Sequence, residues 1–449
     1  LETPWANYWR AVIHEIHWKD ADLTDQDLIV EGCYTPDPQP GFIAGIRLEP
    51  LDKLPEQRPP KVDFPMAMTE DGHGIFWVMP HRRREDLLET YEKIPDDTAM
   101  KIMLWNGAHG DHCYYPTKVG EYGGPATEDY YRHGARNLHG NMELWKQKGW
   151  DAMETARNYC RSRGWEIHLT IRVQAFSMMY PYDTEGASRF FLDHPEYWCR
   201  DREGRAVARM SYAIPEVQEH MLGIVKELSA YDPDGVGLLF IRGVPMVLYE
   251  EASVQGFMEE HGEDPRQLHE YDPRWMKYQG DVVNGFMRRM REVLKPGQKL
   301  SAVTPGNKFE CARWGLDIET WLKEGLVNDL YPTGQVFSDH DVHTDSPCSL
   351  DLEYFQQLEG RERIRLIPQL YPAKMFKQEL GEWRKLVRSF KARGADGYCV
   401  WDGAGYETEK FRYLGTDKSG PAGKPPSSVI KISMVGDYRV DRYHPVEAH

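Results

Sequence analysis

The sequence predicts an α/β protein whose main part is a (β/α)8 TIM barrel, preceded by a short β-rich appendage. Short apolar runs alternate with amphipathic helical segments along most of the chain, and this alternation is typical of parallel βαβ units. Eight such runs occur, which favours a closed barrel over the alternative of an open, doubly wound sheet. The length of 449 residues fits one barrel with loop insertions better than two equal domains.

Three segments are expected along the chain. Residues 1–60 are predicted to form the β-rich appendage, or the tail of a β-sandwich, because a strand-like run at 42–48 lies between Pro-rich stretches. Residues 61–410 are expected to form the barrel. Residues 411–449 are expected to form a C-terminal extension that packs on the barrel, and the run at 428–434 is a candidate for its closing element.

The barrel strands are expected at the apolar runs. In chain order they lie at 74–79, 101–106, 165–173, 236–241, 299–303, 326–331, 364–371 and 397–401. Alternation is clearest in the third of these runs, where His168, Thr170 and Arg172 share one face and apolar residues share the other.

Helices are expected between these strands, at 84–94, 142–162, from 215 onward, 273–294, 318–324, 352–358 and 378–391. The helix that begins at Pro215 has a proline in its first turn, and Val217, Met221 and Leu228 lie on one face at helical spacing. Glycines, which favour helix C-termini, follow several of these segments, namely Gly164, Gly325 and Gly394.

Composition and charge exclude several classes of protein. The net charge of −16 argues against binding to nucleic-acid phosphates. No run of about 18 apolar residues occurs, so no membrane span is expected. Residues 1–5 have neither a basic start nor an apolar core, so no signal peptide is expected. The seven cysteines include no CxxC pair, which argues against a structural zinc site or a disulfide framework.

Polar residues near the C-terminal ends of barrel strands are the candidates for function, because active sites of this fold lie at that face. Asp111 and His112 follow the second strand and can bind hydroxyls or a metal, or can simply hold their own loop. Arg172 ends the third strand and is a candidate to bind substrate. His168 is a second candidate on the same face, with a buried core histidine as the alternative.

Carboxylates near strand ends suggest acid/base chemistry. Glu250 follows Tyr249 and apolar residues, so it is a candidate proton donor, although an acid at a helix N-terminus is the alternative. Asp329 and Asp402 are expected near the mouth, and either could be the second carboxylate or could orient an arginine. Two carboxylates are the usual requirement for glycoside hydrolysis. The remaining candidates for substrate binding are Arg242, Tyr249, Glu310, Tyr331, Gln369, Tyr371 and Trp401.

The segment 338–345 contains His340 and His343 among aspartates and could be interpreted as a metal-binding loop. Its spacing matches no strong metal motif. We therefore predict no metal and no cofactor. A metal-dependent hydrolase that uses this loop, Asp111 or His112 is kept as an alternative.

Several motifs resemble those of the glycosyl-hydrolase-like family 10 barrel proteins. The resemblance lies in four stretches between residues 75 and 405: 149–168, 194–204, 234–242 and 315–329. It implies a barrel, sugar chemistry and an exported bacterial protein, in the periplasm or outside the cell. One departure is that the aspartate of the family's fourth strand corresponds to Leu239 here.

We therefore expect a glycoside hydrolase that cleaves a poly- or oligosaccharide with two carboxylates at the barrel mouth. Its expected partner is a carbohydrate and not a nucleic acid. The sequence does not predict an oligomeric state. The departure at Leu239 keeps a non-catalytic carbohydrate-binding barrel as an alternative.

Overall fold

A computed structural model of the protein describes most of the chain between residues 62 and 417. The described residues are 12–13, 62–70, 76–77, 80–123, 133–174, 176, 187–241, 243–336, 346–347, 349–370, 380–403, 408–417 and 433–434. The chain divides into two compact units. One comprises residues 1–60 and 417–449, in which β1 (Val12–Ile13) and β17 (Ser433–Met434) pair antiparallel. The other, Lys61–Thr416, contains the barrel.

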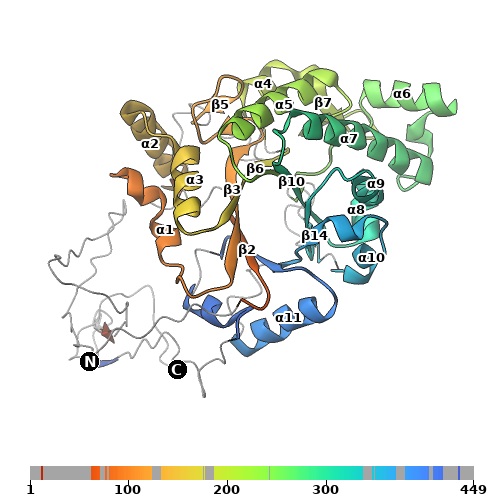
Figure 1. Ribbon diagram of the computed structural model, residues 1–449. Helices are drawn as coiled ribbons and strands as arrows, with labels where there is room; N and C mark the ends of the chain where they lie inside the picture. The colour runs from red at the N-terminus through yellow and green to blue at the C-terminus, as the bar shows by residue number, and fades with distance from the viewer. Residues whose placement is uncertain are drawn as a thin grey trace, which may run out of the picture. The chain divides into compact units, whose positions relative to one another are not determined.

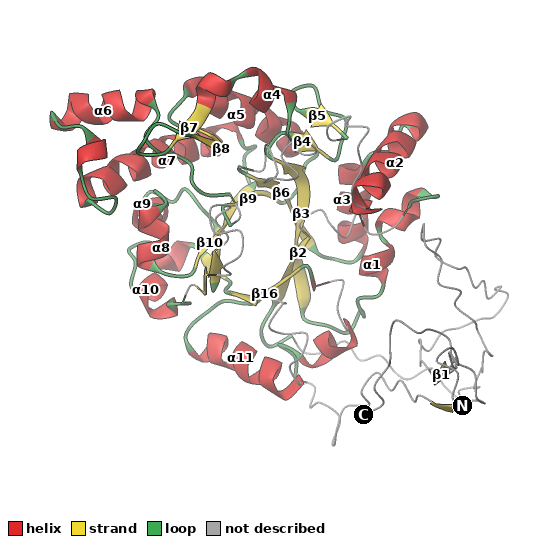
Figure 2. Cartoon of the chain, turned by 180° about the vertical axis from the view of Figure 1, so that it is seen from behind, coloured by secondary structure: helices red, strands yellow, loops and turns green. Residues whose placement is uncertain are grey.

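The central feature of the larger unit is a closed ring of parallel strands surrounded by helices (Figures 1 and 2). The ring closes because β2 pairs with both β3 and β16. The predicted (β/α)8 TIM barrel is therefore confirmed. Around the ring the order is β2 (Met66–Glu70), β3 (Met100–His109), β6 (Glu166–Arg172), β9 (Gly235–Leu239), β10 (Lys299–Pro305), β11 (Asp329–Thr333), β14 (Arg365–Leu366) with β15 (Gln369–Leu370), and β16 (Tyr398–Trp401).

Helices follow the strands along the chain and form the outer layer (Figure 2). The α-helices are α1 (Glu89–Glu92), α2 (His133–Lys148), α3 (Ala152–Ser162), α4 (Arg189–Asp193), α5 (Pro215–Ala230), α6 (Glu251–His261), α7 (Pro273–Val293), α8 (Lys308–Arg313), α9 (Ile318–Lys323), α10 (Leu352–Gln356) and α11 (Leu380–Ala392). Short 3-10 helices occur at Arg84–Leu87, Pro195–Tyr197, Pro265–Gln267, Arg361–Arg363 and Thr408–Tyr413. Within the described residues, no helix is both long enough and apolar enough to span a bilayer.

Short strands outside the ring extend its connections. The antiparallel pair β7 (Trp198–Arg200) and β8 (Ala206–Met210) lies between α4 and α5 in the chain. The other short strands are β4 (His112–Cys113), β5 (Glu121–Tyr122), β12 (Gln335–Val336) and β13 (Ser346–Pro347).

Glycines in β9 make room for larger side chains inside the barrel. A Cβ atom on Gly235 would lie 2.9 Å from the His168 ring, and one on Gly237 would lie 2.7 Å from the Thr170 side chain and 2.8 Å from Ser301. All three distances are shorter than the contacts that a real Cβ atom makes. Above this level an apolar cluster fills the barrel, with contributions from Leu104, Leu239, Val303, Tyr331 and Trp401 among others.

Four expectations about individual elements are wrong, and each has a local cause. The first barrel strand is β2 rather than 74–79, since residues 76–77 are not in a strand. The sixth strand begins at Asp329 rather than at Leu326, because Gly325 adopts a left-handed φ of 69° and the Leu326 N–H still bonds back to the Trp321 carbonyl of α9. Residues 326–328 therefore belong to the turn.

The other two corrections concern a helix and the closure. The single helix expected at 142–162 is two helices, because Gly149 has a φ of 63° and Asp151 caps the new helix by accepting from two backbone N–H groups. The candidate closing element contributes β17, which pairs with β1 and not with a barrel strand. The strand expected at 42–48 lies outside the described residues.

Candidate functional site

The mouth of the barrel, defined as the C-terminal ends of its strands, collects residues from opposite sides of the ring. Asp402 directly follows β16, and Glu70 is the last residue of β2. These two strands are neighbours, with Trp401 paired to Thr69. Parallel neighbours lie about 4.8 Å apart, so the two acids follow one another around the rim of the mouth.

Asp402 has an unusual backbone conformation. Its φ is 45°, in the left-handed region that non-glycine residues seldom adopt. Its N–H donates to the Thr69 hydroxyl at 3.3 Å, and its side chain is partly exposed. Strain of this kind is often found at functional sites, where the surrounding structure maintains it.

Glu70 is buried and accepts a hydrogen bond from the Tyr91 hydroxyl of α1. The Tyr91 ring contacts the Trp105 ring at 4.6 Å. Burial raises the pKa of Tyr91 well above its usual value, and the charges of Glu70 and Asp402 raise it further. The negative charges of Glu70 and Asp402 therefore both disfavour ionisation of the Tyr91 hydroxyl.

A second group of residues occupies the interior just below the rim. The Arg172 guanidinium, at the end of β6, lies 5.5 Å from the centre of the Trp401 ring across the barrel. Tyr331 and Gln369 are buried, and the Tyr331 hydroxyl and the Gln369 Oε1 atom have no hydrogen-bond partner among the described residues. Burying such groups without partners is costly, so they are suited to bind the hydroxyls of a ligand.

Asp111 and His112 lie at the turn that follows β3 and are both buried. The Asp111 carboxylate accepts from Nε2 of His220 in α5 at 3.1 Å, and the His220 ring stacks on Phe190 at 3.8 Å. The Oδ1 atom of Asp111 has no partner within the described part of the chain. These contacts hold the turn against α5.

An open groove of about 620 Å³ lies among segments that follow β6, β9 and β10. It is lined by residues of the β7–β8 turn and of the segment 245–249. His269, Glu270 and Trp314 complete the lining. Tyr249 accepts a hydrogen bond from Arg202 at 3.0 Å, and its ring stacks on Trp275 at 5.0 Å.

Glu250 does not line this groove. Its carboxylate is buried and accepts from the hydroxyls of Ser211 and Ser253 and from the backbone N–H of Leu248. Burial raises the pKa of Glu250, although these hydrogen bonds oppose the shift. Glu310, in α8, is half-buried and pairs with Arg313 at 2.9 Å.

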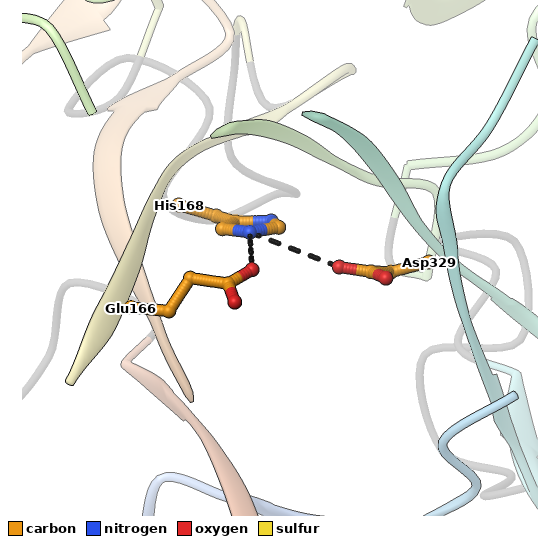
Figure 3. Close-up of side chains that lie close together, drawn as sticks. All are labelled: Glu166, His168 and Asp329. Carbon is orange, nitrogen blue, oxygen red and sulfur yellow. Dashed lines mark hydrogen bonds and ion pairs between the residues drawn. The ribbon is translucent and has the colours of Figure 1, made fainter. Parts of the chain in front are cut away.

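Asp329 lies at the opposite end of the barrel from its expected place. Because β11 begins with this residue, it belongs to the floor, which we define as Glu166, His168, Lys299, Asp329 and Arg365 at the N-terminal ends of the strands. Figure 3 shows the His168 ring facing both Glu166 and Asp329. His168 donates from Nε2 to Glu166 at 2.7 Å and lies 3.7 Å from Asp329.

Cations complete the floor. Arg365 donates to Asp329 at 2.6 Å and to Glu166 at 2.6 Å, and Lys299 donates to Glu166 at 2.8 Å. Burial alone would raise the pKa of Glu166, but the hydrogen bonds from His168, Arg365 and Lys299 hold it well below its usual range. His168 is thus a paired core histidine, the alternative that the sequence left open.

The floor acids and His168 also have the spacing of metal ligands, since their ligand atoms lie within 4.8 Å of one another. A cation would compete there with Lys299 and Arg365, which already neutralise both carboxylates. The donor set therefore does not fit a metal.

The described cysteines are free and buried, namely Cys113, Cys160, Cys199, Cys311 and Cys399.

Some candidates lie outside the described residues, namely Arg242, Tyr371 and the loop at 338–345. The sequence analysis missed Glu70 because it placed the first strand at 74–79, whereas the first strand is β2, which ends at Glu70. Trp314 was missed because it follows a short helix, α8, that the pattern did not predict. Glu166 and Arg365 carried a signal, since both are charged residues at the start of an apolar run.

Sequence comparison identifies no relatives: neither a family model nor a curated protein matches the chain. Among solved structures, the fold is similar to the glycoside hydrolase domain of PgaB (BpsB) from Bordetella bronchiseptica. The TM-score is 0.51 at 13% identity, over 79% of this chain and 99% of that domain.

Weaker likenesses connect the chain to other glycoside hydrolase barrels. The catalytic domain of β-amylase from Paenibacillus polymyxa has a TM-score of 0.48 at 11% identity, over 81% of this chain and 96% of that domain. The α-galactosidase from Thermus thermophilus, in complex with stachyose, has a TM-score of 0.41 at 14% identity, over 80% of this chain and 66% of that protein. The likeness to the PgaB domain concerns the fold alone and agrees with the closed ring of parallel strands described above.

Proposed function

We propose that the protein is a glycoside hydrolase that cleaves a poly- or oligosaccharide at the mouth of the barrel. The observation that supports this most directly is the pair of acids, Asp402 and Glu70, at the ends of neighbouring strands β16 and β2. The backbones of neighbouring parallel strands lie about 4.8 Å apart, and a retaining mechanism would require the two carboxyl groups themselves to lie about 5–5.5 Å apart.

The two acids have different surroundings, which suits different roles. Asp402 is the more exposed of the two and is proposed as the nucleophile or base. Glu70, shielded from water beside Tyr91, is proposed to protonate the leaving oxygen. Glu250 is proposed to position the groove wall, because its carboxylate is already engaged by Ser211 and Ser253.

Substrate hydroxyls would be bound by the polar groups below the rim. The Tyr331 hydroxyl and the Gln369 carbonyl oxygen lack partners among the described residues. Trp401 is buried in the barrel cluster and is proposed to position the Arg172 guanidinium, which lies over its ring, for contact with substrate. Asp111 is proposed to hold the turn after β3 in place at the mouth through its hydrogen bond with His220.

The test is release of reducing sugar from a panel of neutral oligosaccharides by the wild type and Asp402→Asn. Asparagine tolerates the left-handed conformation, so the backbone is preserved. We expect at least one substrate to be cleaved and kcat to fall about 10²–10⁴-fold in the variant. Asp63→Asn, at a surface pair with Lys391, is the control. Wild-type kcat in Asp402→Asn would refute the assignment.

A second candidate function is carbohydrate binding without cleavage. It is favoured by the apolar end of β9, where Leu239 and Ile241 are buried in the barrel cluster and no acid faces the interior from this strand. A panel on which every oligosaccharide binds and none is cleaved would support this candidate.

A further inference from the structure

The groove beside the mouth has the dimensions of a ligand site. Its volume of about 620 Å³ falls within the range of about 300–1,000 Å³ for small-molecule pockets. Leu248 and Tyr249 form one wall, and Trp314 contributes from the segment after α8. The proposed catalytic acids are not among its lining residues, so it has no role in the mechanism given above.

Aromatic rings continue from the groove onto the surface. Tyr271 and Phe309 are 36% and 48% exposed, and their rings meet at 5.2 Å in an edge-on contact. His269, which lines the groove, contacts the Tyr271 ring at 5.4 Å. Among the large hydrophobic residues that are exposed in the described chain, only these two are aromatic. Exposed aromatic surface is therefore concentrated at this rim.

Polar groups in the groove suit a ligand that carries hydroxyls. The indole N–H of Trp314 has no acceptor among the described residues. Glu270 is exposed and offers acceptors, while Arg202 is held against the Tyr249 hydroxyl. A ligand that both donates and accepts hydrogen bonds would satisfy these groups, whereas a purely apolar ligand would leave the indole N–H unpaired.

The charges of the groove argue against an anionic ligand. Asp201 and Glu203 both pair with Arg205, which leaves one negative charge among these three groups. Glu270 adds a negative charge and Arg202 a positive one, so the lining has three acids against two arginines, and the chain as a whole carries −16. A glycan rich in uronic acids would therefore be repelled, while a neutral one would not.

We infer that this groove is a binding subsite for one or two pyranose units of a neutral oligosaccharide, which extends from it across Tyr271 and Phe309. The inference rests on the proposed function, because it assigns the groove to the glycan that the mouth cleaves. The subsite strengthens the binding of longer substrates and leaves the chemical step unchanged. Its rings supply stacking surface, and Trp314 and Glu270 supply hydrogen bonds.

The test is calorimetric titration with hexasaccharides of cellulose, starch, xylan and chitin, and with hexagalacturonate as the charged probe. Tyr271→Ala and Phe309→Ala are the informative variants because both side chains are exposed, and Trp314→Ala extends the series. We expect at least one neutral hexasaccharide to bind, with affinity about tenfold weaker in each variant. Hexagalacturonate should not bind. Leu386→Ala, 38% exposed on α11, is the matched control and should bind normally.

The outcomes separate this inference from the proposed function. Unchanged affinity in Tyr271→Ala and Phe309→Ala, or no binding of any neutral hexasaccharide, would overturn the subsite. Asp402→Asn should bind hexasaccharide normally and lose turnover. If the wild type cleaves nothing but the rim variants weaken binding, the subsite stands and the hydrolase fails. If Tyr271→Ala and Phe309→Ala bind normally and Asp402→Asn loses turnover, the hydrolase stands and the subsite fails.

Discussion

The floor and the mouth of the barrel both carry acidic side chains, but the acids meet different partners. At the floor, Glu166 and Asp329 are bound by Lys299 and Arg365, so each carboxylate is neutralised by a cation. At the mouth, Glu70 accepts from an uncharged phenol, and the backbone of Asp402 is held in a left-handed conformation.

We propose that this difference separates acids that stabilise the fold from acids that take part in the chemistry. A carboxylate that is fully paired with arginine is a poor nucleophile or base, because reaction would break its ion pair. In barrels of this type the N-terminal face serves stability and the C-terminal face serves catalysis. Substitutions at the two ends of the barrel would test that division in this chain.

The largest effect is expected at the mouth, for Glu70→Gln. Loss of the proposed proton donor should lower kcat about 10²–10⁴-fold, while the amide still accepts from Tyr91 and preserves the fold. Initial-rate kinetics on the best oligosaccharide would measure it. Glu319→Gln, at an exposed pair with Lys308, is the control. Comparable rates in both variants would remove Glu70 from the mechanism.

The next effect is expected at the floor, for Asp329→Asn. The substitution removes the charge of the buried Asp329 carboxylate and leaves Arg365, whose side chain is 33% exposed, with Glu166 alone as its acidic partner, so the free energy of unfolding should fall by about 3 kcal/mol. Urea denaturation measures this change. Asp281→Asn, at an exposed pair with Lys277, should be nearly neutral. A neutral Asp329→Asn would mean that the floor does not stabilise the barrel.

A smaller loss of stability is expected for Gly237→Ala, just above the floor. The new methyl would lie 2.7 Å from the Thr170 side chain and 2.8 Å from Ser301, which should cost about 1–3 kcal/mol. Thermal unfolding would detect it. Gly285→Ala, in α7 with no atom within 4 Å, should instead raise stability by up to about 1 kcal/mol. Equal melting temperatures in the two variants would contradict the packing argument.

The smallest effect concerns pH. The pKa of Glu166 is lowered in the folded protein, so its stabilisation is fully present above its unfolded value of 4.5 and is lost as pH falls below that value. Stability should therefore decline less between pH 5 and pH 3 in Glu166→Gln than in the wild type. Urea midpoints at the two pH values measure the difference. Identical slopes would show that the floor carboxylate is not held ionised by its partners.

The sequence predicted the barrel correctly because seven of the eight apolar runs contain a barrel strand and alternate with helices, although the first run does not. Its errors at the site come from strand ends. A shift of three residues, from Leu326 to Asp329, moved one acid from the mouth to the floor. Because the first strand was placed after Glu70, this residue was not recognised as the last residue of a barrel strand. Strand boundaries depend on tertiary contacts, such as the Asn328 N–H bond to Leu300, that no local pattern encodes.

The central division between mouth and floor is tested most directly by measuring kcat per folded molecule for Asp402→Asn and Asp329→Asn side by side. The measurement is made in buffer and at a temperature where circular dichroism shows both variants to be folded. The account predicts a loss of about 10²–10⁴-fold for Asp402→Asn and near wild-type kcat for Asp329→Asn. A greater loss in Asp329→Asn than in Asp402→Asn would contradict it.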